Sequence, residues 1–292
     1  MTTSTTSSNA VRAGRAGVSE QAADAAVDQA CRMLRLPTMR ARFGEVADAA
    51  QREQLTYRGF LAELLMAECD DRDRRRSARR ISAAGFPREK WLQDFDYAAN
   101  PHIQPAVIAQ LAACAWVAKG EPLCLIGDSG TGKSHLLIGL GAAAAMAGHR
   151  VKYVLAAKLV NELVEAADER QLSKTIARYG RVDLCALTSS ATWNSTGPAE
   201  LLFQILTERE ETNSVAIASN ESFSGWTKTF TDPRLCAAIV DRLTFGGNII
   251  IQTGPSAEPD VRGRSALPSA GRWRVGSLAA RAQRRCGWAY RR

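Results

Sequence analysis

The residues from Gly127 to Ser134 have the types and the spacing of a phosphate-binding loop. They read Gly-Asp-Ser-Gly-Thr-Gly-Lys-Ser, which fits the pattern G-x-x-x-x-G-K-S. An apolar run at 123–126 precedes the loop and an apolar segment at 135–147 follows it, so we expect it between a strand and a helix. There, glycines let backbone N–H groups approach phosphates, and the helix N-terminus favours negative charge. The sequence therefore predicts a site for a nucleoside triphosphate.

Each position of the loop has an expected role. The Lys133 ammonium should reach the β- and γ-phosphates, and the Ser134 hydroxyl should bind Mg²⁺. The other positions should offer backbone N–H groups: Gly127, Asp128, Ser129, Gly130, Thr131 and Gly132. The predicted cofactors are ATP and Mg²⁺.

Apolar spacing divides the chain into two kinds of structure. Over residues 20–100 it follows helical intervals, which predicts a small helical domain. Over residues 101–253 short apolar runs alternate with helical segments, as in a doubly wound α/β core. The expected parallel strands are 123–126, 151–155, 182–187, 215–219 and 248–251. The expected helices are 133–147, 157–167, 199–211 and 233–244, with a further core helix at 105–118.

The two ends of the chain look different from the rest. Residues 1–19 are rich in Ser, Thr and Ala, and residues 254–292 are rich in Arg; we expect both to be disordered. Of the net charge of +8, residues 254–292 contribute +7. The rest is nearly neutral, so the overall charge is a poor argument for nucleic-acid binding.

Ordered motifs beyond the loop carry a resemblance to a known family. They are Leu-Pro-Thr-Met-Arg-Ala from 36, Phe-Leu-Ala-Glu-Leu-Leu-Met-Ala-Glu from 60, Phe-Pro-Arg-Glu-Lys-Trp-Leu-Gln-Asp-Phe-Asp from 86, Ala-Glu-Leu-Leu-Phe-Gln from 199, Ser-Asn-Glu-Ser-Phe-Ser-Gly-Trp from 219 and Asp-Arg-Leu-Thr-Phe-Gly-Gly from 241. From about residue 34 to 250 the chain resembles the IstB-type ATP-binding proteins of insertion sequences. These are AAA+ ATPases related to DnaC-type helicase loaders. The resemblance implies a five-stranded AAA+ P-loop NTPase core behind a helical N-terminal domain.

The resemblance also implies roles for two further residues. Asn220, at the end of the fourth expected strand, matches a polar sensor of the γ-phosphate; the alternative is an ordinary strand-end cap. Arg242 matches an arginine that reaches the nucleotide of a neighbouring subunit, and the alternative is a surface helix charge. An arginine finger stabilises transition-state charge. This role would require a homo-oligomer.

The acidic pair that should follow the third strand is missing. The family has Asp-Glu there, which holds Mg²⁺ and orients water, but this chain has Thr188 and Ser189, with no acid between Asp183 and Glu200. Asp183 lies at the start of the strand and is a poor substitute. We therefore expect nucleotide binding to be weakened and hydrolysis to be greatly reduced. Whether the chain is an enzyme stays open.

A local frame slip would explain this loss. Residues 188–197 can be encoded so that a reading one base earlier gives Asp-Glu-Leu-Gly-Tyr-Met-Glu-Leu-Asp-Arg, and the family pattern resumes at Ala199. The slipped region would lie within 185–198. Lysine-free residues 252–292 could likewise be GC-rich DNA read out of frame, or a nucleic-acid-binding tail. Codons that cannot spell Asp-Glu one base back would exclude the slip at 188.

Arginines cluster near the end of the helical domain. On a helix such a stripe could neutralise DNA phosphates without reading sequence; the alternative is a solvated face paired with Asp71 and Asp73. We expect Trp91 and Phe95, which follow, to pack between the domains. The expected DNA contacts are Arg72, Arg75, Arg76, Arg79 and Arg80.

Composition excludes some other classes. No apolar run reaches the roughly 18 residues of a membrane span. The seven cysteines are scattered without C-x-x-C spacing, which favours reduced thiols in the cytoplasm.

Four functions remain open. The first is an ATP-dependent helper of transposition that binds double-stranded DNA and assists a transposase. The others are a helicase loader, a nucleotide-binding pseudo-ATPase and a decayed transposon remnant. A transposase gene next door would distinguish the first from the second.

Overall fold

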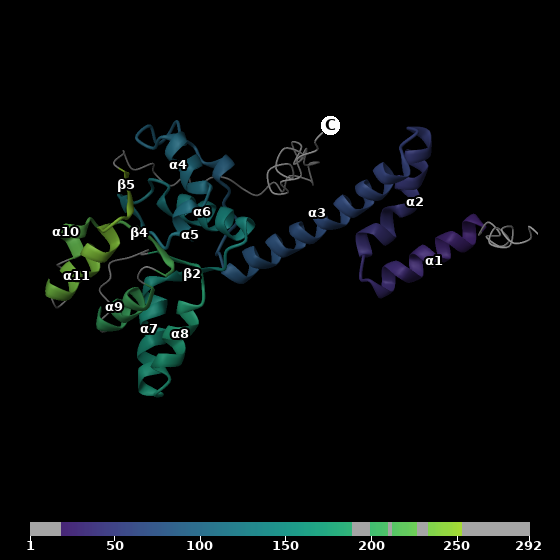
Figure 1. The fold of residues 1–292 in the computed structure, drawn as a ribbon. Helices are drawn as coiled ribbons and strands as arrows, with labels where there is room; N and C mark the ends of the chain where they lie inside the picture. The colour runs from purple at the N-terminus through teal and green to yellow at the C-terminus, as the bar shows by residue number, and fades with distance from the viewer. Residues whose placement is uncertain (1–18, 189–198, 210–211, 227–232, 253–292) are drawn as a thin grey trace, which may run out of the picture. The chain divides into compact units, whose positions relative to one another are not determined.

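The computed structural model describes residues 19–188, 199–209, 212–226 and 233–252 (Figure 1). The expected tails at 1–19 and 254–292 lie outside the described residues, apart from Ser19. The segment that should follow the third strand, 189–198, also lies outside them.

Three helices form the N-terminal part: α1 (Glu20–Met33), α2 (Pro37–Arg52) and α3 (Tyr57–Ala84). The Ser19 hydroxyl accepts the Ala22 N–H at the start of α1, and Thr56 does the same for Gly59 at the start of α3. Gly85, with φ of 74°, ends α3. The helical structure predicted for this part of the chain is therefore confirmed.

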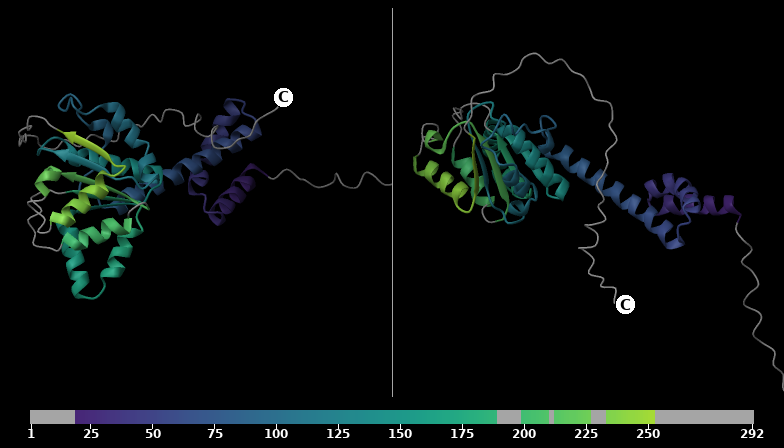
Figure 2. Two further views of the ribbon diagram at one scale, coloured as in Figure 1. Left: turned by 60° about the vertical axis from the view of Figure 1, so that its left-hand side comes forward. Right: turned by 90° about the horizontal axis from the view of Figure 1, so that it is seen from above.

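A parallel five-stranded sheet forms the core, in the order β2-β3-β4-β1-β5 (Figure 2). The strands are β1 (Leu123–Gly127), β2 (Val151–Leu155), β3 (Leu184–Thr188), β4 (Ser214–Ser219) and β5 (Asn248–Gln252). All five strands were predicted from apolar runs, because strands covered on both faces are almost entirely apolar.

Helices cover both faces of this sheet. Alternate strand residues enter two separate apolar clusters; Leu125 and Ala218 belong to one, and Ile126 and Ile217 to the other. The first face is covered by α4 (Pro105–Ala112), α5 (Ala115–Ala118) and α6 (Lys133–Ala147). The second is covered by α7 (Ala156–Asp168), α8 (Leu172–Gly180), α9 (Ala199–Arg209) and α11 (Pro233–Thr244). The short helices η1 (Leu92–Asp94) and α10 (Phe223–Trp226) lie in connections.

Several boundaries differ from the sequence prediction for local reasons. The third strand begins at Leu184, two residues later than expected, because the Asp183 side chain bonds Arg150 before the ladder begins. The helix expected at 105–118 breaks at Cys114, whose φ is 60°. The nine-residue α8 was not predicted.

Two sequence-level observations have counterparts in the described residues. No helix among them is both long and apolar enough to cross a membrane. The six described cysteines, Cys31, Cys69, Cys114, Cys124, Cys185 and Cys236, are all free thiols.

Candidate functional site: a phosphate loop beside a strand end without acids

The phosphate loop connects β1 to α6, as predicted. Gly132 begins the helix with φ of 86°, and a Cβ there would lie 2.6 Å from the Phe95 ring. A Cβ at Gly127 would lie 1.9 Å from the Gln252 carbonyl oxygen of β5. Both positions therefore require glycine, one for conformation and crowding and the other for a close approach of backbone.

Lys133 is held inside the loop. Its side chain is buried, and its Nζ donates to the Asp128 carbonyl and, at 3.3 Å, to the Thr131 hydroxyl. The Thr131 hydroxyl donates to the same Asp128 carbonyl at 2.9 Å. Burial lowers the pKa of the Lys133 ammonium, and the Asp128 carboxylate opposes this change. A cation is therefore fixed at the centre of the loop, and phosphate oxygens could replace the acceptors that its ammonium now contacts.

The residues of the loop fit a polyphosphate. No side chain caps the N-terminus of α6, so the N–H groups of its first turn face the loop. Ser134 is exposed at this helix start, where its hydroxyl can bind a metal ion that accompanies the nucleotide. Nowhere in the described part of the chain do three His, Cys, Asp or Glu side chains form a cation site.

The loop is braced by the segment before the core. Phe95 is buried, and its ring packs edge-on against His135 of α6, with centroids 5.4 Å apart. The His135 Nε2 lies 2.8 Å from the Trp91 carbonyl oxygen. Phe95 thus packs against the first turn of α6; that it lies between two domains stays a prediction. The sequence shows Asp-Phe-Asp at 94–96, before the phosphate loop. It does not show that Phe95 packs against the helix that follows the loop.

The end of β3 has no carboxylate in the described residues. Thr188 is its last residue, aligned with Leu155 of β2 and Ala218 of β4. The Thr188 side chain is buried and hydrogen-bonded to the Tyr153 hydroxyl. Because all five strands are parallel, this end lies at the same sheet edge as the phosphate loop. A threonine therefore occupies the position at which the metal-binding Asp was expected.

Asp183 lies at the opposite edge of the sheet. Its carboxylate accepts the Arg150 backbone N–H at 2.7 Å and pairs with the Arg150 guanidinium at 2.7 Å. Burial raises the pKa of the Asp183 carboxyl, but the Arg150 hydrogen bonds outweigh it, so the pKa lies below its ordinary value. Asp183 therefore has a structural partner and cannot replace the missing acids.

Asn220 lies where the sequence predicted a sensor. It follows β4 directly, and the last residue of β4, Ser219, aligns with Ile126 of β1. Asn220 is exposed beside the first residue of the phosphate loop. Ser219 is buried; its hydroxyl accepts the Glu221 N–H and the Trp226 indole N–H, which fixes the strand end.

Arg242 lies away from the loop of its own chain. It projects from α11 onto α9, with its guanidinium 4.6 Å from the Phe203 ring centroid and bonded to the Thr207 hydroxyl. A cleft that it lines also contains Pro122 and Asn213, which precede β1 and β4. Arg242 therefore sits toward the amino ends of the strands, away from the phosphate loop.

The arginine stripe lies on α3 and is partly paired. Arg72 pairs with Glu68 at 2.9 Å, and Arg76 pairs with Asp73 at 3.4 Å. Arg74 and Arg75 share Asp71, at 2.8 and 2.6 Å respectively. The pairing with Asp71 and Asp73 expected for a solvated helix face is therefore present. Arginines nevertheless outnumber acids along this part of the helix.

This fold and this loop define a class: the chain has a P-loop nucleotide-binding core built on a five-stranded parallel sheet. The chain belongs to the family of IstB-like ATP-binding proteins, whose model matches residues 29–260. The resemblance predicted from the motifs is thus confirmed.

Individual relatives agree with this assignment. The chain is 34% identical to an insertion-sequence ATP-binding protein of Sinorhizobium fredii, over 74% of this chain and 73% of that one. It is 35% identical to the ATP-binding protein of insertion sequence IS21 from Pseudomonas aeruginosa, over 67% and 74%. Among solved structures, the DnaC helicase loader is similar at 19% identity and a TM-score of 0.43, over 50% of this chain and 86% of that one. We draw no functional argument from that distant likeness.

Proposed function

We propose that this protein is an ATP-binding helper of transposition that binds double-stranded DNA and assists a transposase, with impaired ATP hydrolysis. The observation that carries the proposal is the phosphate loop with its buried Lys133, in a chain of the family that insertion sequences encode. A transposase and a DNA substrate would both be cytoplasmic, and we propose the cytoplasm as its site of action.

Nucleotide binding rests on residues that the chain retains. Lys133 would exchange its bonds to Asp128 and Thr131 for phosphate oxygens, and the N–H groups at the start of α6 would take the remaining charge. Mg²⁺, when bound, supplies charge neutralisation between the β- and γ-phosphates. Ser134 would be its protein ligand. Asn220 would orient the γ-phosphate or a water from the neighbouring strand end.

Hydrolysis lacks its acidic partners. Thr188 is uncharged, buried and bonded to Tyr153, so it offers the metal no negative charge. The next residue in the sequence, Ser189, cannot act as a carboxylate base. A nucleotide-binding protein without turnover is therefore the form of the helper that we favour. An active oligomer would also need Arg242 from a neighbouring subunit.

The helper function can be tested with purified components. The first step is to read the DNA beside this gene for a transposase gene. The measurement is then strand transfer by that transposase on a duplex target, with and without this chain and a non-hydrolysable ATP analogue. We expect stimulation that requires nucleotide and is abolished by Lys133→Ala. No stimulation, together with delivery of a ring helicase onto DNA, would support the helicase-loader alternative instead.

A further inference from the structure

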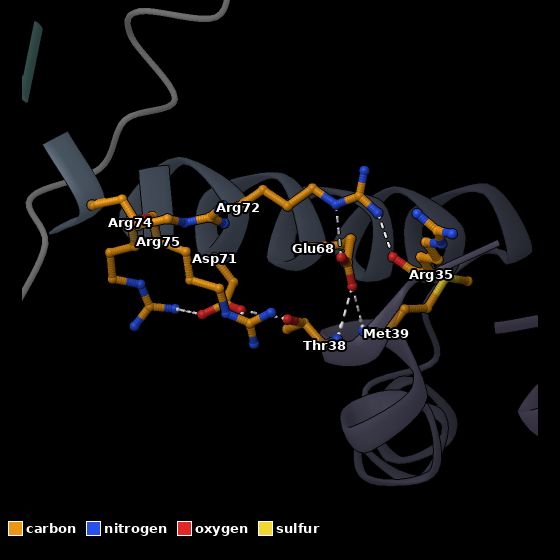
Figure 3. A network of polar contacts seen from close by, with 9 residues as sticks. Arg35, Thr38, Met39, Glu68, Asp71, Arg72, Arg74 and Arg75 are labelled. Carbon is orange, nitrogen blue, oxygen red and sulfur yellow. Dashed lines mark hydrogen bonds and ion pairs between the residues drawn. The ribbon is translucent and has the colours of Figure 1, made fainter. Parts of the chain in front are cut away.

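The acids of α3 serve a structural purpose that the sequence did not reveal. Helix α2 begins with Pro37 after Leu36, which provides no side-chain cap. Glu68 of α3 accepts the first N–H groups of α2 instead, from Thr38 at 2.8 Å and from Met39 at 3.0 Å (Figure 3). A carboxylate at a helix N-terminus is stabilised by the helix dipole. Glu68 therefore joins α2 to α3.

Neighbouring contacts strengthen this junction. Asp71 accepts the Thr38 hydroxyl at 2.7 Å, and Arg72 bridges Glu68 and the Arg35 carbonyl (Figure 3). Burial raises the pKa of Glu68, but the Met39 and Thr38 N–H groups and Arg72 outweigh it, so the carboxyl stays ionised. Arg72 is thus tied down within the protein.

A positively charged pocket of about 440 Å³ lies beside this junction. The turn between α1 and α2 forms one side of it and α3 forms the other. The one acid in its lining, Glu68, is 3% exposed and already holds two N–H groups and Arg72. The lining residues with a positive charge are Arg35, Arg72, Arg75, Arg76 and Arg79.

Three arginines of α3 in this pocket, Arg75, Arg76 and Arg79, have guanidinium groups that an external anion can reach. Arg75 and Arg76 are exposed. The Arg76 pair with Asp73 lies at the surface, where such pairs are weak, and Arg75 shares the half-buried Asp71 with Arg74. Among the described residues, Arg79 bonds only the Arg75 carbonyl, through Nε, which leaves its terminal nitrogens for a ligand. Guanidinium groups match phosphate geometry with paired N–H donors.

We infer that this pocket is a binding site for DNA backbone phosphates, with Arg35, Arg75, Arg76 and Arg79 as the contacts and Arg72 as an internal strut. The inference rests on the proposed function, because it locates the DNA contact of that function. Residues 72 to 79 span about 10 Å of helix. One DNA strand places a phosphate about every 3.4 Å along the axis, so about three phosphates can face this length.

The arginines that line the pocket are not the same set as the stripe predicted from the sequence. Arg80 belongs to the predicted stripe but does not line the pocket, whereas Arg35, more than thirty residues away in the sequence, does. The site also differs from a simple charged face, because Glu68 holds the start of α2 and Arg72 holds the Arg35 carbonyl, which fixes this turn against α3. It is independent of the phosphate loop.

The test compares two triple variants of the full chain. Arg75→Gln/Arg76→Gln/Arg79→Gln removes three charges from the pocket, and Arg58→Gln/Arg74→Gln/Arg80→Gln removes three from the same helix outside it. Binding of a duplex of arbitrary sequence is measured over a range of salt concentrations. For the pocket variant we expect the slope of log K against log[salt] to fall by about three and the affinity at 0.1 M salt to fall at least about 10-fold. The control should change much less.

Each other outcome has a definite meaning. Equal losses in both variants, or no loss in the pocket variant while the wild-type chain binds DNA, would overturn the pocket but leave the proposed function standing. A wild-type chain that binds no duplex even at low salt would overturn both. Weakened binding of inorganic phosphate with unchanged duplex binding would identify a free-anion site and overturn the inference.

A single substitution keeps the test decisive if the triple variant fails to fold. Arg79→Gln leaves the contacts of Glu68 and Asp71 intact, so α2 and α3 stay joined. We expect its salt slope to fall by about one. An unchanged slope would contradict the assignment of Arg79.

Discussion

The carboxyl ends of β1 and β3 lie at the same edge of the sheet, separated by β4 alone, but they are followed by very different residues. After β1 every position of the phosphate loop is present, the Lys133 side chain is buried among the acceptors of its hydrogen bonds, and Phe95 packs against the first turn of the helix. After β3, where acids were expected, Thr188 is bonded to Tyr153. The scaffold around both strand ends is the same buried parallel sheet.

We infer that the nucleotide-binding part and the hydrolytic part of an ATPase site can be separated in one fold. Binding of polyphosphate uses backbone N–H groups and one ammonium, which depend on the loop. Turnover uses carboxylates on a neighbouring strand. Loss of those acids removes no apolar contact from β3, whose residues Leu184–Thr188 are all buried, so the sheet persists without them.

The largest predicted effect is on ATP turnover, when Arg242 is replaced in a version of the chain whose acids are restored. In a version carrying Asp-Glu-Leu-Gly-Tyr at 188–192, we predict that Arg242→Ala lowers ATP turnover by about 10³-fold, because an arginine finger stabilises transition-state charge. Arg234→Ala on the same helix is the control. Mixing Arg242→Ala subunits with Lys133→Ala subunits should recover part of the turnover. Failure to recover any would argue against a role between subunits.

Removing the ammonium of the phosphate loop should affect binding next most strongly. Lys133→Ala is expected to weaken binding of a fluorescent ATP analogue about 10- to 100-fold, the effect of losing charged hydrogen bonds. Lys158→Ala, an exposed lysine of α7, should leave it unchanged. Equal affinity in wild type and Lys133→Ala would mean that the loop is not the nucleotide site.

A smaller effect is expected from a methyl group at the helix start. Gly132→Ala combines a positive φ with a clash against Phe95, whereas Gly148→Ala has a positive φ and open space. Each should lose about 1 kcal/mol of unfolding free energy from backbone strain. Gly132→Ala should lose more, and should also weaken nucleotide binding. Chemical denaturation and nucleotide titration of both variants measure the difference; identical losses would show that Phe95 moves freely.

The smallest predicted effect is on stability, from replacing Asp183 at the amino ends of the strands. Because the Asp183 pKa is lowered in the fold, its pairing with Arg150 stabilises the protein above about pH 4 and this contribution is lost as pH falls through the lowered pKa. Asp183→Asn should therefore cost about 1 kcal/mol at pH 7 and remove that pH dependence. Nucleotide affinity should not change. A large fall in affinity would mean that Asp183 serves the site after all.

Much of this molecule could be predicted from the sequence because local patterns determine it. Buried parallel strands are apolar runs, and the phosphate loop is a contiguous motif whose neighbours are fixed by chain connectivity. The family motifs place Asn220 correctly after β4. Those features require no knowledge of which helix faces which.

Contacts between distant segments could not be predicted in this way. Glu68 reads as one acid among several, yet its partners Thr38 and Met39 lie on another helix and give it its role. Pairing of the arginine stripe with Asp71 and Asp73 could be predicted from the sequence, but the place of Arg35 beside it could not. Only the packing of α1, α2 and α3 brings the turn between α1 and α2, which carries Arg35, to α3. The Arg242 contacts with α9 were missed for the same reason.

We propose that this chain binds ATP on an intact scaffold but lacks the acids for turnover. The most direct test is ATP hydrolysis in the presence of double-stranded DNA, comparing the chain with a version that carries Asp-Glu-Leu-Gly-Tyr in place of residues 188–192. We predict that both bind nucleotide and that hydrolysis is substantial only in the restored version. Equal turnover by the unaltered chain would contradict the account and would mean that another acid, with Glu200 the first to substitute, serves the metal.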